Sequence, residues 1–131
     1  MIIDTLTTFS ESQALTASAD SANTIDLGAA GVATYPLYAV FVLEKALTSA
    51  TDFQVLGSDT QSGTYAGVVA TGSQAAAKLT EGAHICVPLP PNCPRYLKAH
   101  YTMGGSGTGT VTSFLAFNPQ TNREDTMTDA A

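Results

Sequence analysis

Short runs of alternating apolar and polar residues, separated by Gly, Pro, Ser and Asn, follow one another through most of the chain. The clearest run, residues 96–103, puts four apolar side chains on one side of an extended chain and polar ones on the other. Residues 35–47 are apolar on both sides, which is typical of a central strand covered on both faces. Turn signals recur roughly every 8 to 15 residues, which favours a sandwich or barrel over alternating strands and helices. Strands are predicted over residues 23–27, 35–47, 53–56, 64–71, 84–89, 96–103 and 110–117.

The apolar faces of strands this short need a second sheet to cover them. We therefore predict an all-β fold, a two-sheet antiparallel sandwich of about eight strands. The one helix-like patch, residues 74–79, is long enough for one or two turns. The side chains expected to be mostly buried in this sandwich are Leu37, Phe41, Leu43, Val55, Val87, Leu97, Tyr101, Val111 and Leu115.

The two ends of the chain depart from this pattern. Residues 1–12 are predicted to form an N-terminal arm, residues 13–118 the sandwich core and residues 119–131 a polar tail, all within one domain. Residues 12–22 are rich in Ser and Ala and are expected to form a helical turn or an irregular loop. Water opposes the exposure of large apolar side chains, so the arm either binds a partner or folds back as an edge strand of its own sandwich. Its candidate partner-binding residues are Ile2, Ile3, Leu6 and Phe9.

The chain carries little charge, since 12% of its 131 residues are charged and its formal net charge is −6. Nucleic-acid binding normally needs clustered Lys and Arg, whereas the five basic residues here are scattered along an acidic chain. The same argument disfavours an anionic membrane surface, and no run approaches the ~20 apolar residues that span a bilayer. A weakly charged surface suits permanent contact with another protein, so we expect a protein partner, including further copies of this chain.

Four residues of metal-binding type lie close together in the sequence: His84, Cys86, Cys93 and His100. Their spacing lacks the closely paired cysteines of zinc sites, so neither a metal nor another cofactor is predicted. The N-terminus has no signal-peptide pattern, so we expect the chain to be made in the cytoplasm, where both cysteines stay reduced.

No pattern in the sequence singles out an enzyme active site, and no catalytic residue is predicted. The two histidines and many serines show no nucleophile motif, and a strand rather than a helix is predicted after the glycine-rich residues 104–109, unlike a phosphate loop. A carboxylate pair for sugar hydrolysis would converge only in three dimensions, and eleven acidic residues are more simply a solubilising surface. Five tyrosines are expected to pack within strands, with an aromatic platform for sugar as the alternative: Tyr35, Tyr38, Tyr65, Tyr96 and Tyr101.

Several short motifs are shared with a known family. In the first 28 residues they are Met1-Ile2-Ile3-Asp4, Phe9-Ser10, Gln13-Ala14-Leu15-Thr16, Ser21, Asn23 and Ile25-Asp26-Leu27-Gly28. Later and more generic ones are Leu89-Pro90, Arg95-Tyr96-Leu97, Tyr101 and Gly109-Thr110-Val111-Thr112. With these motifs the chain resembles the small capsid cement, or decoration, proteins of short-tailed bacteriophages, a family first described from a Bordetella phage.

The resemblance implies a jelly-roll subunit on the exterior of a phage capsid. Such a subunit pairs across two-fold positions and clamps neighbouring major capsid proteins, so a homodimer is favoured over a trimer. It implies no enzyme activity and no cofactor. A second hypothesis, from another functional class, is a carbohydrate-binding jelly roll from a phage fibre or a bacterial lectin. A cement protein would co-purify with phage heads in hundreds of copies, whereas a receptor-binding protein would be found with tails in few copies.

Overall fold

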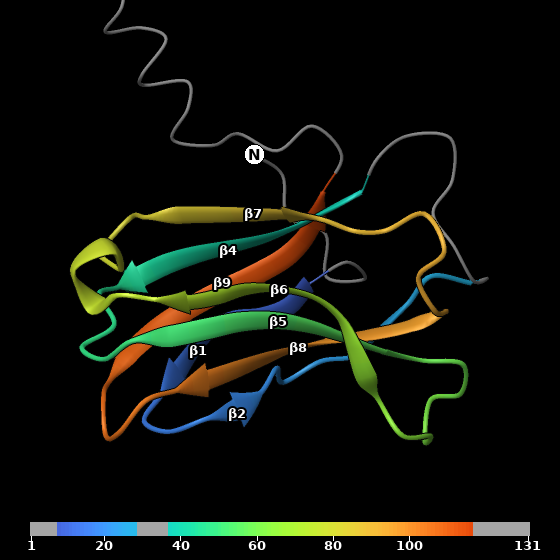
Figure 1. Ribbon diagram of the computed structural model, residues 1–131, viewed down its shortest axis with the longest axis horizontal. Helices are drawn as coiled ribbons and strands as arrows, with labels where there is room; N and C mark the ends of the chain where they lie inside the picture. The colour runs from blue at the N-terminus through green and yellow to red at the C-terminus, as the bar shows by residue number, and fades with distance from the viewer. Residues whose placement is uncertain (1–7, 29–36, 117–131) are drawn as a thin grey trace, which may run out of the picture.

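The chain folds into two antiparallel β-sheets that pack face to face, as the computed structural model shows for residues 8–28 and 37–116 (Figure 1). The first sheet, here called the β4 sheet, has the strand order β1-β9-β4-β7. Its strands are Thr8–Leu15 (β1), Gly109–Ala116 (β9), Tyr38–Lys45 (β4) and His84–Pro88 (β7). The second, here called the β5 sheet, has the order β2-β8-β5-β6, with β3 also paired to β8. Its strands are Ala19–Asp20 (β2), Ile25–Asp26 (β3), Tyr96–Met103 (β8), Thr51–Ser58 (β5) and Ala66–Gln74 (β6).

The order in which the chain visits the two sheets is that of a jelly roll. Successive strands lie in opposite sheets, except for β2 and β3, which both pair with β8, and the β5–β6 hairpin. Each sheet therefore brings together strands that are far apart in the sequence, such as β1 beside β9. The predicted all-β, two-sheet antiparallel sandwich is confirmed.

The core lies between the sheets and has aromatic rings at its centre. Phe41 and Phe53 have ring centroids 5.1 Å apart, and Tyr101 lies edge-on to both, at 6.1 and 6.0 Å. The hydroxyl of Tyr101 is hydrogen-bonded to those of Ser10 (2.8 Å) and Ser113 (2.6 Å), which satisfies three buried polar groups together. Burial raises the pKa of Tyr101, so this hydroxyl stays protonated. All nine side chains predicted to be buried are at most 9% exposed.

Sequence patterning predicted strand β1 only as one of two alternatives for the arm. It crosses the boundary expected after residue 12 between arm and core, and it occupies part of the segment 12–22 that was expected to be a helical turn or loop. Its pairing with β9 shifts register twice, between Thr8 and Ser10 and between Ser10 and Gln13. Such bulges insert extra residues and hide the alternation of apolar and polar positions. The short helix is a 3-10 turn over Ala76–Lys78 (η2).

Candidate interaction surface

The outer face of the β5 sheet carries ion pairs. Strand β8 directs Lys98 and His100 away from the core, as its alternation predicts, and β2 runs beside it. The carboxylate of Asp20 on β2 contacts both side chains. Its Oδ2 lies 3.0 Å from Lys98 Nζ, and its Oδ1 lies 2.6 Å from His100 Nδ1. The hydrogen bond to His100, assisted by Lys98, holds the pKa of Asp20 below its ordinary value.

The neighbouring strand β3 repeats this arrangement. Arg95 donates two hydrogen bonds to Asp26, of 2.7 and 3.0 Å, and the backbone N–H of Gly28 donates a third to the same carboxylate. These hydrogen bonds lower the pKa of Asp26, and those from Arg95 contribute more than the one from Gly28. The two short strands are thus held on β8 by charge pairs facing solvent, and this outer face is the water-compatible side of the sandwich.

The acid–base cluster on β2 gives a pH-dependent prediction. Replacing Asp20→Asn is expected to lower the free energy of unfolding at pH 7 by about 0.2–1 kcal/mol, the range of solvent-screened ion pairs. Because the pKa of Asp20 is lower in the folded than in the unfolded chain, its contribution is present above about pH 4 and is lost as pH falls through the folded-state value. Thermal unfolding of both proteins should therefore converge in acid. A difference that persists at the lowest pH, or an equal effect of Asp59→Asn in an exposed loop, would contradict this assignment.

The described tyrosines do not form a common aromatic platform. Lys98 Nζ lies 4.6 Å from the ring centre of Tyr65, and the guanidinium of Arg95 lies 5.0 Å from that of Tyr96. Tyr101 is buried in the core, and Tyr38 is on the other sheet. Sugar stacking needs free ring faces that lie near one another, so this arrangement gives no support to a carbohydrate site.

The outer face of the β4 sheet has the opposite character. The strand register lines up Thr8, Phe114, Val40 and Cys86 in one row across the sheet. Val40 and Phe114 alternate with residues of the core between the sheets, so their side chains point to the outer face. They are nevertheless only 0% and 2% exposed. We define the apolar outer face by Tyr38, Val40, Val42, Cys86 and Phe114, of which Tyr38, Val42 and Cys86 are half-buried. Burial raises the pKa of the Cys86 thiol, so this residue acts as a neutral apolar group.

The two ends of the apolar outer face differ from each other. At the polar end, Glu44 accepts a 3.0 Å hydrogen bond from Thr112. At the other end, Tyr38 pairs with Ala116, and Thr8 begins β1 one row away. Strand β1 therefore begins at this end of the apolar outer face.

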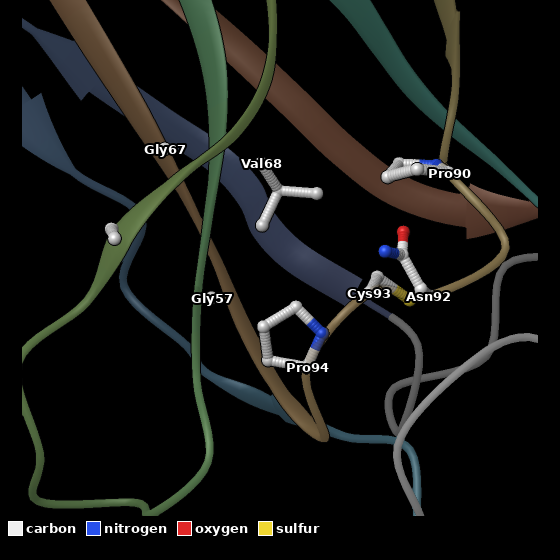
Figure 2. Close-up of a pocket in the computed structure, with 8 residues that line it drawn as sticks. Gly57, Gly67, Val68, Pro90, Asn92, Cys93 and Pro94 are labelled. Atoms are coloured by element: carbon white, nitrogen blue, oxygen red, sulfur yellow. The ribbon is translucent and has the colours of Figure 1, made fainter.

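A shallow hollow of about 230 Å³ lies between β5, β6 and the loop after β7 (Figure 2). Gly57 and Val68 line it from the strands, and Pro90, Cys93 and Pro94 line it from the loop. Asn92 also lines this hollow, and none of its lining residues is charged, so the hollow offers no group for acid–base chemistry.

Comparison with known proteins places the chain in a family. The family model Bbp16 matches residues 9–117. The chain belongs to the Bbp16 family.

Other comparisons add little to this membership in the Bbp16 family. No curated protein matches the chain significantly. One solved structure, "Structure of infectious bursal disease virus Gx strain", is similar at 16% identity and a TM-score of 0.30. The similarity covers 82% of this chain but only 30% of that viral chain, and it is too weak to bear on fold or function.

The candidate partner-binding residues of this Bbp16-family chain fall into two groups. Phe9 is 0% exposed and packs inside its own sandwich, which is the edge-strand alternative for this part of the arm. Ile2, Ile3 and Leu6 lie outside the residues that the structure describes, and their partner-binding role stays a prediction. The apolar outer face was not predicted as a site. The sequence feature that could have revealed it is the strand predicted at residues 35–47, which is apolar on both sides.

The four residues of metal-binding type are not brought together in this member of the Bbp16 family. His84 and Cys86 belong to the outer face of the β4 sheet, whereas His100 projects from the outer face of the β5 sheet. Cys93 is buried in the loop after β7. Within residues 8–28 and 37–116, no three His, Cys, Asp or Glu side chains gather as metal ligands, and no helix is long and apolar enough to cross a bilayer.

Proposed function

We propose that this chain is a bacteriophage virion protein that binds the outside of a phage head and cements neighbouring major capsid proteins, which stabilises the capsid. The role is structural and needs no catalytic residue, metal or cofactor. The observation that supports it is the difference between the two outer faces of the sandwich. One carries the ion pairs of Asp20 and Asp26, and the other carries Val42, Tyr38 and Cys86 on an apolar sheet.

This difference suits a protein that lies between a capsid and water. Burial of apolar surface is favourable by roughly 25 cal/mol per Å², so the part of the apolar outer face that is still half exposed, at Tyr38, Val42 and Cys86, gains from contact with the capsid. The paired charges of the β5 sheet would lose hydration if they were buried, so they are better left in water. Residues 2–6 precede β1, which begins at this face, and we propose that they add Ile2, Ile3 and Leu6 to the same contact.

The test uses purified heads that lack this protein, to which variants are added back. Val42→Lys places a charge on the apolar outer face and is expected to weaken binding at least about tenfold, because a buried unpaired charge costs more than 1.4 kcal/mol. Deletion of residues 2–6 is expected to weaken binding without unfolding the sandwich, since β1 begins at Thr8. Co-sedimentation with heads and the thermal stability of decorated heads are the measurements.

The matched control is Thr102→Lys, which adds the same charge to an exposed position of β8 on the opposite outer face. This variant is expected to bind heads as the wild type does. Circular dichroism of each free variant checks that the sandwich is intact. Normal binding by both Val42→Lys and the deletion, or failure of the wild-type protein to bind heads, would refute the proposed function.

A further inference from the structure

Two side chains on the outer face of the β4 sheet are buried although they point away from the core. Val40 and Phe114 do not belong to the hydrophobic cluster between the sheets, yet they are 0% and 2% exposed. Side chains stand roughly perpendicular to a sheet, so neighbours in the same sheet shield their flanks and leave their tips open. Within residues 8–28 and 37–116 the strands form two sheets and no third layer. Full burial of both side chains therefore requires a further piece of polypeptide over the centre of this face.

The chain has three segments outside the described residues that can supply this piece. Residues 117–131 carry four charged side chains, which suit water better than an apolar face. Residues 29–36 have to join β3 in the β5 sheet to β4 in the β4 sheet. Residues 1–7, here called the leading segment, contain one charged residue and four large apolar ones, Met1, Ile2, Ile3 and Leu6. Composition and connectivity therefore favour the leading segment.

The leading segment starts from the right place and is long enough to cross this face. It leads into Thr8, the first member of the row that crosses the four strands of the β4 sheet. That row covers three strand spacings, or about 14 Å at ~4.8 Å each. Seven extended residues reach about 23 Å at ~3.3 Å per residue. A segment that runs along the row therefore crosses Phe114 and Val40 and arrives at Cys86 close to its own Ile3.

We propose that the leading segment packs across the apolar outer face of its own chain in the free protein and forms a third layer over Phe114 and Val40. The segment is apolar, as are the side chains that it covers, so their removal from water favours the contact. Successive side chains of an extended segment point to opposite sides. Those that do not pack on the sheet stay available to a partner, together with the half-buried Tyr38 and Val42. The inference goes beyond the proposed function, because it concerns the free protein and is tested without heads.

The reactivity of a thiol at the position of Val40 measures this cover directly. Both native cysteines are replaced by alanine, and Val40→Cys then supplies the single thiol. Its reaction with dithionitrobenzoate is expected to be slow in the full chain and at least about a hundredfold faster after deletion of residues 2–6, because the deletion leaves the thiol facing water. The matched control is Val55→Cys in the same background, since Val55 is 1% exposed between the two sheets. The control thiol is expected to stay unreactive with and without the deletion, and circular dichroism verifies that each variant is folded.

A disulfide shows which copy supplies the segment. Cys86 is kept, Cys93→Ala removes the buried thiol, and a new cysteine is placed by Ile3→Cys or, in a second variant, by Asp4→Cys. Alternation turns these two neighbouring side chains to opposite sides, so one of them faces the sheet. Mild oxidation is expected to join that cysteine to Cys86 within one chain, which a non-reducing gel shows as a monomer without free thiols. Thr102→Cys, on the opposite outer face, is the control and is expected to form no bond to Cys86.

Each of the two measurements can overturn the inference. A Val40→Cys thiol that reacts rapidly in the full chain would show that the face is uncovered, and one that stays slow after the deletion would show that another segment covers it. A disulfide that joins two chains, or its absence with both new cysteines, would show that the segment does not lie on its own sheet. All these results would leave the proposed function standing. Failure of the wild type to bind heads would remove that function without changing the reactivity of the thiol.

Discussion

Replacing Phe53→Ala is expected to destabilise the protein by about 3–5 kcal/mol, the range measured when a large buried side chain is truncated in a core. Phe53 is 0% exposed and packs against the rings of both Phe41 and Tyr101, so its loss leaves a cavity lined by rigid aromatic groups. For a chain of this length the thermal midpoint should fall by about 10 to 20 °C. Thermal and urea unfolding followed by circular dichroism measure both quantities.

The control for this variant is Phe53→Leu, which keeps most of the volume and apolar surface. Its cost is expected to stay near 1 kcal/mol, because cores tolerate apolar substitutions of similar size. Equal effects of the two substitutions would show that the aromatic contacts, rather than the filled volume, stabilise this site. A loss below about 1 kcal/mol for Phe53→Ala would mean that the surrounding side chains collapse into the space.

The second large effect is expected for Gly57→Ala at the hollow between β5, β6 and the loop after β7. A Cβ at this position would lie 2.8 Å from Pro94 Cγ, 2.9 Å from Pro94 Cδ and 2.9 Å from Val68 Cγ2. The pyrrolidine ring of Pro94 is tied to the backbone, so it moves only if the loop moves. Overpacking of this kind costs about 1–3 kcal/mol, and the unfolding midpoint in urea should fall accordingly.

Gly67→Ala is the matched control, because Gly67 lines the same hollow but has open space beside it. Its effect on the free energy of unfolding is expected to stay within about 0.5 kcal/mol. If both variants lost equal stability, the cause would be the backbone freedom of glycine in the two strands rather than contact with Pro94. Wild-type stability of Gly57→Ala would show that the loop gives way at little cost.

Sequence patterning predicted the elements whose alternation is unbroken. Strand β8 has the expected bounds, Tyr96–Met103, because its apolar and polar residues alternate through all eight positions. Strand β1 was predicted only as one of two alternatives for the arm, because two bulges break the same alternation and Ser12 adopts a positive φ of 49° there. Patterning measures the period of a strand, and a bulge changes that period locally.

The surfaces were less predictable than the core, because they depend on strands that are distant in the sequence. The partners of Asp20 are Lys98 and His100, which come from a strand 78 to 80 residues away. Composition reveals that residues 66–74 lack charge, but the strand order is needed to show that they form an edge. The apolar outer face likewise needs the register that aligns Val40 with Phe114.

The position of β9 in the β4 sheet limits when this fold can form during synthesis. Although β9 is the last strand of the described residues, it lies between β1 and β4 and pairs with both. The apolar outer face therefore does not exist until residue 116 has left the ribosome. At roughly 5–20 residues per second, a nascent chain spends several seconds without it. A subunit still being translated consequently lacks the assembled surface that we propose to bind a head, and capsids would recruit only finished copies.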